Sequence, residues 1–153
     1  MKKKLEKKLE KKKEKKLEKK PKKITTTQLK KKAWTVFSIF IRKKNSNSNG
    51  DCKCVTCGGI SHWKKMQAGH YVGGRNNTVL FNEKLVFPQC YRCNVILKGN
   101  YAQYTLFMLD KGYTKDEIQE MLYLKSKVRK WKPNELKEIE IMYKDKIKHL
   151  EQI

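Results

Sequence analysis

Two pairs of cysteines, each with two residues between its members, are the residues best suited to chemistry in this chain. Cys54 and Cys57 lie in "CVTCG", and Cys90 and Cys93 lie in "PQCYRCN". Together they can offer four thiolates to one tetrahedral ion, which is the ligand set typical of structural zinc. Four thiolates fill the coordination shell of zinc and leave no position open for catalysis. The spacing therefore predicts a structural Zn²⁺ site and requires any reaction to occur elsewhere.

A fifth cysteine, Cys52, lies two residues before Cys54 and is an alternative ligand. The two-residue spacing favours Cys54 with Cys57, so we expect Cys52 to be spare. No apolar run approaches the roughly 18 residues of a transmembrane helix, and the first residues are lysines without a following apolar segment. We therefore expect a soluble chain that is not exported and has no membrane partner. In such a chain the cysteines stay reduced and bind metal rather than form disulfides.

A histidine and an asparagine lie close to the cysteine pairs. His70 lies in "MQAGHYV", on an expected β segment after the first pair, and Asn94 directly follows Cys93. Zinc would bring these two stretches together. A histidine can take a proton from water near neutral pH, and an amide oxygen can help to hold a hard divalent cation. Base, metal and phosphate in line are the requirements of phosphodiester cleavage, although His70 could also be an ordinary surface or packing histidine.

Several short motifs, in this order, resemble the phage NinG/Rap recombination endonucleases. They lie between residues 33 and 104 and are "AWTVFSIFIRKK", "CVTCG", "MQAGHYVGGRNN", "LFNEK", "PQCYRCN" and "LKGN". The arrangement also resembles the zinc-stapled HNH (ββα-metal) nucleases, including phage endonuclease VII. The resemblance implies that His70 is a general base, that Asn94 is a ligand of a catalytic Mg²⁺ or Mn²⁺, and that the four paired cysteines hold zinc. It further implies cleavage of branched DNA, such as Holliday junctions and D-loops, in the cytoplasm of a bacterial host cell.

Two positions depart from the HNH pattern. Many HNH enzymes have an aspartate directly before the catalytic histidine as a second metal ligand, and that position is Gly69 here. The middle asparagine of the pattern corresponds to Leu85. Asn82 lies nearby and could orient the histidine loop, and Asn100, in "LKGN", is a further candidate ligand or a helix cap. The ligands of a catalytic ion beyond Asn94 therefore stay open.

Hydrophobic spacing, caps and turn residues predict an α+β protein. We expect a Lys-rich tail over residues 1–24, an N-terminal helix over residues 25–44 and a helical C-terminal extension over residues 105–153. Between them, the resemblance implies a small zinc-stapled ββα-metal (HNH-like) nuclease core over residues 51–104. The N-terminal and C-terminal helices would flank this core.

Local signals define the expected elements more closely. Thr26 or Thr27 can cap the first helix, and short strands are expected near "HWKKMQAGHYV" and "TVLFN". A short helix should begin within "CYRCNVILK". The next helix, "YAQYTLFMLDKG", should stop at Gly112. A helix capped by Thr114 should run to about residue 130, and Pro133 suits the first turn of the last helix.

Charge is the strongest global feature, with 38 Lys and Arg against 15 Asp and Glu and a formal net charge of +23. Such an excess favours polyanionic partners, above all nucleic acid. Residues 1–32 alone contain 17 lysines and 4 glutamates. The Lys-rich tail over residues 1–24 could raise the encounter rate with DNA or simply keep the chain in solution. Near the candidate site, the basic residues that could contact phosphate or could be solvated surface charges are Lys64, Lys65, Arg75, Arg92 and Lys98.

Three functions fit these features. The first is a structure-selective DNA endonuclease with His70 as its base and Mg²⁺ or Mn²⁺ as its catalytic ion. The second is a zinc-stapled DNA-binding accessory protein of recombination without catalysis, which Gly69 favours. The third is a zinc-ribbon protein that binds RNA or the ribosome, which only the charge suggests. Symmetric junction resolution needs two active sites, so we expect a homodimer through the C-terminal helices, with other recombination proteins as further candidate partners.

Overall fold

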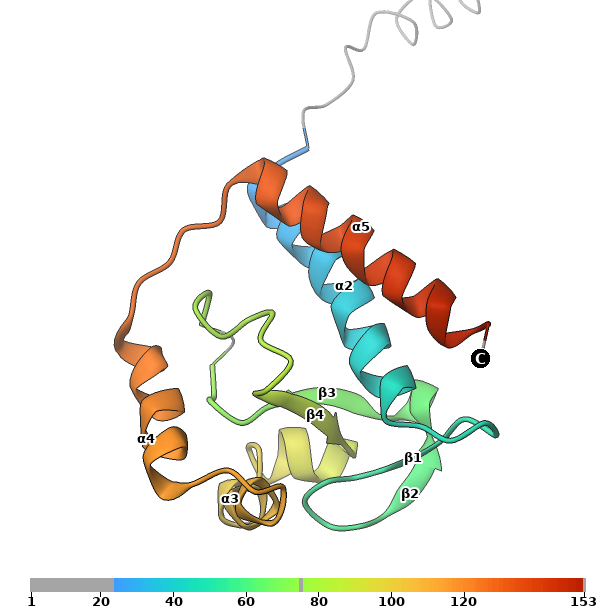
Figure 1. Cartoon of the computed structure of the whole chain (residues 1–153), viewed down its shortest axis with the longest axis vertical. Coiled ribbons are helices and arrows are strands. Elements are labelled where there is room, and N and C mark those ends of the chain that lie inside the picture. Colours follow the sequence, from blue (N-terminus) through green and yellow to red (C-terminus); the bar gives the residue numbers. More distant parts are fainter. Residues whose placement is uncertain (1–23, 75, 153) are drawn as a thin grey trace, which may run out of the picture.

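The computed structural model describes residues 24–74 and 76–152, so the Lys-rich opening and Arg75 lie outside the described residues. Within the described part the chain forms helices and two small antiparallel sheets (Figure 1). The α+β prediction is therefore confirmed. In chain order the elements are α2 (Thr26–Lys44), β1 (Asp51–Lys53), β2 (Ile60–His62), η1 (Trp63–Lys65), β3 (Gln67–His70), β4 (Val86–Gln89), η2 (Arg92–Ile96), α3 (Tyr101–Asp110), α4 (Lys115–Tyr123), η3 (Leu124–Ser126) and α5 (Pro133–Leu150).

The N-cap of helix α2 lies one residue before the two threonines that the sequence offered as caps. Thr25, rather than Thr26 or Thr27, is its N-cap, and Thr25 and Gln28 form a reciprocal capping box. This arrangement satisfies two backbone N–H groups that the first turn would otherwise leave without partners. The apolar residues that this helix buries are Leu29, Ala33, Phe37, Phe40 and Ile41.

The β3–β4 pair differs from the expected strands. Gln67 of β3 lies opposite Gln89 of β4, and His70 lies opposite Val86. The stretch "TVLFN" is not a strand, because it folds into successive tight turns in which the amide of Asn82 donates to the Val79 carbonyl at 3.1 Å. The Asn82 side chain then closes the next turn by accepting from the amide of Lys84 at 3.0 Å. Local side-chain bonding of this kind competes with sheet formation.

Helices cover both faces of the β3–β4 sheet (Figure 1). Ala68 and Val86 pack on one side against α2 and against Tyr143 of α5. Phe87 packs on the other side with Tyr104 of α3 and with residues of α4. Helices α2 and α5 lie side by side and run in the same direction. The sheet that bears His70 is therefore fixed between two hydrophobic layers, which restricts the motion of its strand ends.

The C-terminal helices follow the predicted signals with one exception. Gly112, with φ +92°, follows α3, and Pro133 begins α5, as expected. Thr114 caps α4, but this helix ends at Tyr123 and not near residue 130. The reason is tertiary, because the 76–78 loop forms hydrogen bonds with the backbone of the 125–131 segment and with the Trp131 indole, which hold this segment in a non-helical form.

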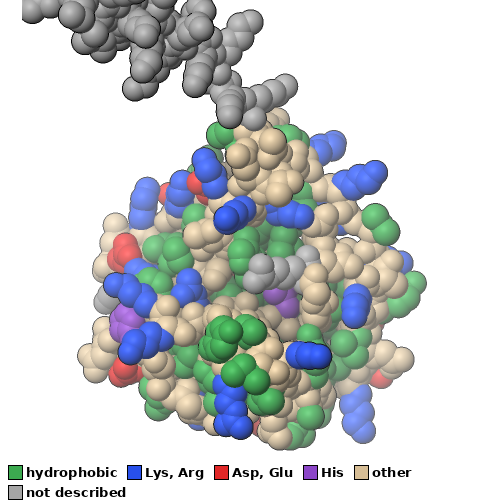
Figure 2. Space-filling model, turned by 180° about the vertical axis from the view of Figure 1, so that it is seen from behind, with side chains coloured by type: hydrophobic (Ala, Val, Ile, Leu, Met, Phe, Trp, Pro, Cys, Tyr) green, Lys and Arg blue, Asp and Glu red, His purple; other side chains and the backbone are tan. Residues whose placement is uncertain are grey.

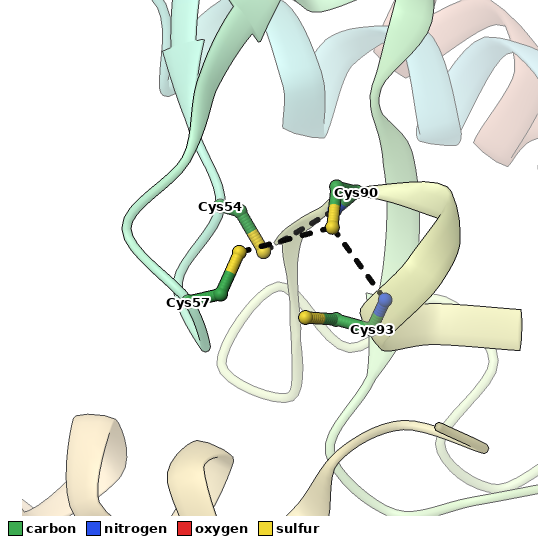
Figure 3. A group of neighbouring side chains, drawn as sticks. All are labelled: Cys54, Cys57, Cys90 and Cys93. Carbon is green, nitrogen blue, oxygen red and sulfur yellow. Dashed lines mark hydrogen bonds between the residues drawn. The ribbon is translucent and has the colours of Figure 1, made fainter. Parts of the chain in front are cut away.

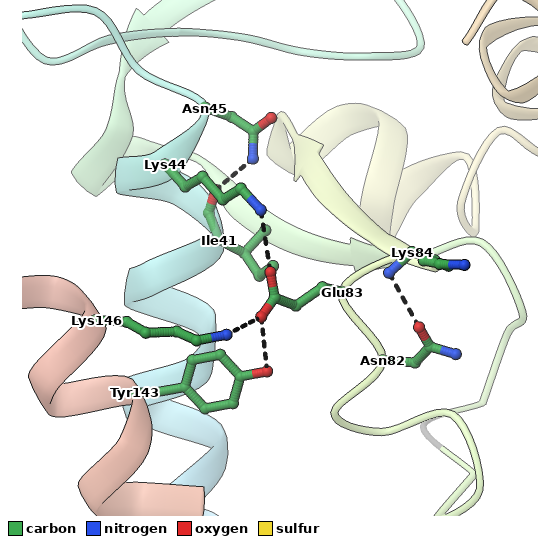
Figure 4. Close-up of polar contacts among 8 residues, drawn as sticks. All are labelled: Ile41, Lys44, Asn45, Asn82, Glu83, Lys84, Tyr143 and Lys146. Atoms are coloured by element: carbon green, nitrogen blue, oxygen red, sulfur yellow. Dashed lines mark hydrogen bonds and ion pairs between the residues drawn. The ribbon is translucent and has the colours of Figure 1, made fainter. Parts of the chain in front are cut away.

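Glu83 joins the turn before β4 to both long helices (Figure 4). Its carboxylate accepts hydrogen bonds from Lys44 of α2 at 3.0 Å and from Lys146 and Tyr143 of α5 at 2.5 and 3.1 Å. Burial alone would raise the pKa of this carboxyl, but the hydrogen bonds from Lys146 and Lys44 outweigh it and lower the pKa. The ionised form is therefore the one that stabilises the fold.

Glu83→Gln should lower the free energy of unfolding at pH 7 by about 1–2 kcal/mol, because two ammonium groups lose their charged acceptor. A lowered folded-state pKa contributes stability above the unfolded pKa of about 4.3, and this stability is lost as the pH falls through the folded value. The difference from wild type should thus be constant between about pH 6 and 8 and shrink only below about pH 5. Urea unfolding of wild type, Glu83→Gln and the exposed-site control Glu120→Gln measures it. A difference that grows on acidification contradicts the role assigned to Glu83.

Candidate functional site

The four paired cysteines converge on one point (Figure 3). Cys54 and Cys57 come from the turn after β1, and Cys90 and Cys93 from the junction of β4 and η2. Their four Sγ atoms all lie within 4.8 Å of one another, and those of Cys57 and Cys90 are 3.8 Å apart. Tetrahedral zinc with Zn–S bonds of about 2.3 Å places its sulfurs about 3.8 Å apart. The cluster therefore fits one zinc ion.

Hydrogen bonds to sulfur favour the thiolate form of one member of this cluster, Cys54. Burial would raise the pKa of the Cys54 thiol, but bonds from the Thr56 hydroxyl and from the Cys90 amide, at 3.3 Å each, outweigh it and lower the pKa to about 6. Cys52 lies outside the group of four, and burial raises its pKa to about 11. Its thiol points to the Arg42 carbonyl at 3.7 Å. The geometry thus separates Cys52 from the four candidate ligands, as the spacing predicted.

His70 and Asn94 line the same cavity. It has a volume of about 490 Å³ and lies between the end of β3, η2 and the start of α3, with a lining formed by Ala68, His70, Gly73, Gly74, Asn94, Val95, Lys98, Gly99 and Tyr101. His70 reaches the cavity as the last residue of β3, and Asn94 does so because it follows the candidate ligand Cys93. The structure thus brings together the histidine and the asparagine that the sequence singled out, and Lys98 lines the same cavity.

The imidazole of His70 is held from two sides. It is 8% exposed, and its Nε2 lies 3.2 Å from the Leu80 carbonyl oxygen. A carbonyl can only accept, so Nε2 carries the proton and the lone pair of the neutral ring is on Nδ1. The indole of Trp34, from α2, stacks on the imidazole with ring centroids 4.8 Å apart and planes 20° apart. Sequence reasoning missed Trp34, although it lies in the motif "AWTVFSIFIRKK".

Asn94 is oriented by a second amide. Its Nδ2 donates to Oε1 of Gln67, the first residue of β3, at 2.5 Å, and its backbone amide donates to the Cys90 carbonyl at 3.0 Å. Since Nδ2 is engaged, the carbonyl Oδ1 is the end of the side chain suited to a cation. No sequence signal connects Gln67 with Asn94, because the two residues are 27 positions apart.

The other candidate ligands have different surroundings. Asn82 bonds within its own turn (Figure 4) and is absent from the described lining of the cavity. Asn100 occupies the N-cap position of α3 but makes no side-chain cap bond. The Asn100 side-chain amide instead donates to Sγ of Cys93 at 3.8 Å, so this side chain faces the cysteine cluster. Leu85, at the middle HNH position, is fully buried in the hydrophobic core.

The basic candidates surround the site at different depths. Lys98 lines the cavity. Arg92 is exposed on η2, and Lys64 and Lys65 are exposed on η1. The Lys64 ammonium also lies 5.8 Å from the centre of the Trp63 ring. Arg75 lies outside the described residues.

Gly69 has no room for a side chain. A Cβ at this position would lie 2.1 Å from Oε1 and 2.8 Å from Cδ of Gln89. Gln89 is fully buried, and its Nε2 donates to the Gly99 carbonyl at 2.8 Å and to the Thr56 hydroxyl at 3.3 Å. An aspartate before His70 would therefore displace an ordered side chain. The Gln89 side chain thus occupies the space that any side chain at position 69 would need.

The turn between η2 and α3 has an unusual backbone. Lys98, Gly99 and Asn100 have φ values of +48°, +101° and +47°, a region that costs most L-residues roughly 1–3 kcal/mol each. The Tyr101 ring packs over this turn so closely that a Cβ on Gly99 would lie 2.9 Å from it, and one on Gly73 would lie 2.1 Å from its hydroxyl. Strained backbone of this kind clusters at functional sites, and here it forms one wall of the cavity.

Fold and site together define an α+β protein with a cluster of four cysteines, whose geometry fits a metal ion, beside a polar cavity. The family model described as Bacteriophage Lambda NinG protein matches residues 1–152, so the chain belongs to the NinG family, as its motifs predicted. It is 28% identical over 123 residues to "Protein ninG" of Salmonella phage P22 and to "Protein ninG" of Escherichia phage lambda. Each match covers 78% of this chain and 56% of the relative, so the chain spans about half the length of these curated relatives.

No solved structure matches the chain. Among the described helices, none has the length and apolar character that a membrane crossing requires.

Proposed function

We propose that this chain is a structure-selective DNA endonuclease of the HNH type that hydrolyses phosphodiester bonds in branched recombination intermediates, such as Holliday junctions and D-loops. The observation that carries the proposal is the shared cavity of His70 and Asn94 next to the cysteine cluster. The order of elements supports it as well. Two antiparallel strands, β3 and β4, precede the helical turn η2, with His70 at the end of β3 and Asn94 on η2, which is the order expected of a ββα-metal core.

Each residue has a defined part in the proposed reaction. Nδ1 of His70 takes a proton from a water molecule, the water oxygen attacks phosphorus, and the bond from phosphorus to the leaving sugar oxygen breaks. The leaving oxygen then takes a proton from a second water molecule. Lys98, on the cavity wall, binds a phosphate oxygen of the strand. A bound Mg²⁺ or Mn²⁺ would supply stabilisation of the negative charge that develops on the phosphate and the leaving oxygen. Oδ1 of Asn94, oriented by Gln67, is the ligand that this chain would offer to it.

The donor set restricts how such an ion could be held. The described lining of the cavity contains no carboxylate, so phosphate oxygens and water would provide most ligands. Mg²⁺ is commonly bound in this way, with few protein ligands and several retained waters. The zinc ion has a separate, structural role, because it would fix the junction of β4 and η2 and thereby the position of Asn94.

A zinc-stapled DNA-binding accessory protein of recombination is the second candidate function. Gly69 favours it, because Gln89 fills the space that a second metal ligand would need. The two candidates differ in one result. The endonuclease breaks strands of a four-way junction when Mg²⁺ or Mn²⁺ is present, whereas the accessory protein binds the same junction and leaves it intact.

We further propose a homodimer, because symmetric resolution of a junction needs two active sites. Helix α5 uses Leu136 and Tyr143 within its own chain, and its exposed side bears Ile141 and Met142. A dimer through the C-terminal helices would use this exposed side. Light scattering of the protein, alone and with a junction, tests the proposal, and a monomer in both cases contradicts it.

Gln67→Leu should raise the Mg²⁺ concentration needed for half-maximal cleavage by about 10–100-fold, because residues that orient a metal ligand have effects of this size. The fold should be retained, since Gln67 is only partly buried. Gln67→Glu keeps an acceptor for Nδ2 of Asn94 and should stay close to wild type. Gln103→Leu, on the exposed side of α3, is the matched control. An unchanged Mg²⁺ dependence in Gln67→Leu removes the proposed role of Gln67.

Deletion of residues 1–20 removes 12 lysines and 4 glutamates, a net charge of +8. If the tail acts through counterion release, the affinity for DNA should fall and its dependence on salt should become weaker. The preference for junction over duplex should not change, because counterion release acts on both forms of DNA. Titrations at several salt concentrations measure both. An unchanged salt slope means that the tail does not serve DNA binding.

A further inference from the structure

An apolar surface lies beside the cavity, and we name it the η2 patch. It consists of Tyr91, Val95, Ile96 and Leu97, which are 57%, 45%, 63% and 44% exposed. Val95 also lines the cavity that holds His70 and Asn94. Contiguous exposed apolar groups on a water-soluble surface usually mark a binding site. Figure 2 shows a group of hydrophobic side chains close to a histidine on this face, with Lys and Arg side chains around it.

The η2 patch is held rigidly. Its residues lie on both sides of Cys93 of the cysteine cluster, and the Leu97 amide donates to the Arg92 carbonyl at 2.8 Å to close the π-helical turn. The Gly99 amide then returns to the Cys93 carbonyl at 2.9 Å. The turn with positive φ values at Lys98, Gly99 and Asn100 follows at once. The apolar side chains therefore keep a fixed position relative to the cavity.

We propose that the η2 patch binds the exposed faces of unstacked bases at the branch point of DNA and so places the adjacent strand in the cavity. This inference rests on the proposed endonuclease function, whose substrate selectivity it assigns to particular residues. In a continuous duplex the base faces are covered by stacking, whereas a branch point exposes them. Apolar side chains insert at such steps, and aromatic rings such as that of Tyr91 stack on single bases.

The charges around the patch fit a nucleic acid. Arg92 lies on the same helical turn and Lys98 lies at its end, and both are exposed. The apolar side chains of the η2 patch can therefore contact bases while Arg92 and Lys98, on either side, contact phosphates. The chain's own residues 1–23, with 14 lysines and 4 glutamates, carry the same sign of charge and are a poor occupant. A second copy of the chain on this patch would cover the mouth of the cavity.

The test uses fluorescence and affinity without added Mg²⁺ or Mn²⁺, so that cleavage is not required. A four-way junction carries 2-aminopurine, whose fluorescence rises on unstacking, at the branch. Wild type should increase this fluorescence, and Ile96→Ser should largely abolish the increase. The affinity of Ile96→Ser for the junction should fall about tenfold, as expected for the loss of one base contact, while its affinity for a duplex of the same length stays within about twofold. Ile60→Ser, at a 70% exposed isoleucine of β2, should match wild type.

Three outcomes overturn the inference: no change in Ile96→Ser, equal losses on junction and duplex, or conversion of a dimer to a monomer in the absence of DNA. The last outcome would make the η2 patch a subunit interface. Failure of this inference is separable from failure of the proposed function. If wild type and Ile96→Ser both cut junctions but neither unstacks the branch, only the proposed role of the η2 patch is refuted. If wild type unstacks the branch through Ile96 but never cuts, only the proposed catalysis is refuted.

Discussion

His70→Ala is expected to lower the rate of junction cleavage by about 10²–10⁴-fold, the usual effect of losing a positioned general base. The substitution removes Nδ1, the atom proposed to accept the proton of the attacking water. It should leave zinc content and junction affinity close to wild type, because the cysteine cluster and the η2 patch do not include His70. Single-turnover cleavage with excess protein separates the chemical step from binding.

His62→Ala is the matched control for this substitution. His62 lies at the end of β2, where its Nδ1 accepts from the Lys64 amide at 3.3 Å, and it does not line the cavity. It should cleave at the wild-type rate. If His70→Ala kept the wild-type rate and His62→Ala lost it, the active site would have to be placed around β2.

Cys90→Ser is expected to abolish cooperative unfolding of the chain and to reduce bound zinc well below one ion per chain. Structural zinc in small domains contributes apparent binding free energies of about 10–16 kcal/mol, which is comparable with the whole stability of about 5–15 kcal/mol of a typical domain. Cys90 also accepts from the Cys93 amide at 3.5 Å and lies where β4 meets η2. Loss of the Cys90 thiol should therefore release the zinc and also disorder Asn94. Metal analysis and near-ultraviolet circular dichroism measure both effects.

Cys52→Ser should be tolerated with full zinc content. Cys52 is buried, but its Sγ faces the Arg42 carbonyl, and a serine hydroxyl can make the same bond. A folded, active preparation without zinc would refute the zinc site. A loss of zinc in Cys52→Ser would mean that the "CKC" segment provides its ligand through Cys52.

Features that depend on neighbours in the sequence were predictable. The cysteine cluster follows from two short spacings, and the starts of α4 and α5 follow from Thr114 and Pro133, because such interactions span only a few residues. The partner of β3 was not predictable in this way. Val86–Gln89 pairs with it, while the equally strand-like "TVLFN" is held in turns by bonds such as that of Asn82.

The finer structure of the cavity depends on contacts that only the folded chain brings together. Gln67 orients Asn94, and Trp34 stacks on His70, across long stretches of chain. The same holds for Gln89, whose buried side chain fills the space above Gly69. The sequence shows that position 69 is a glycine, but the clash that a side chain there would meet depends on tertiary packing.

The central claim is that this chain cuts branched DNA, and the most direct measurement incubates the zinc-loaded wild-type chain with an end-labelled four-way junction. The same reaction is run with Mg²⁺, with Mn²⁺ and without either ion, and with a duplex of the same sequence. Chelators are left out because they would remove structural zinc. The account predicts strand breaks near the branch only when Mg²⁺ or Mn²⁺ is present, and few breaks in the duplex. A folded, zinc-containing protein that binds the junction and leaves every strand intact with both ions would contradict it.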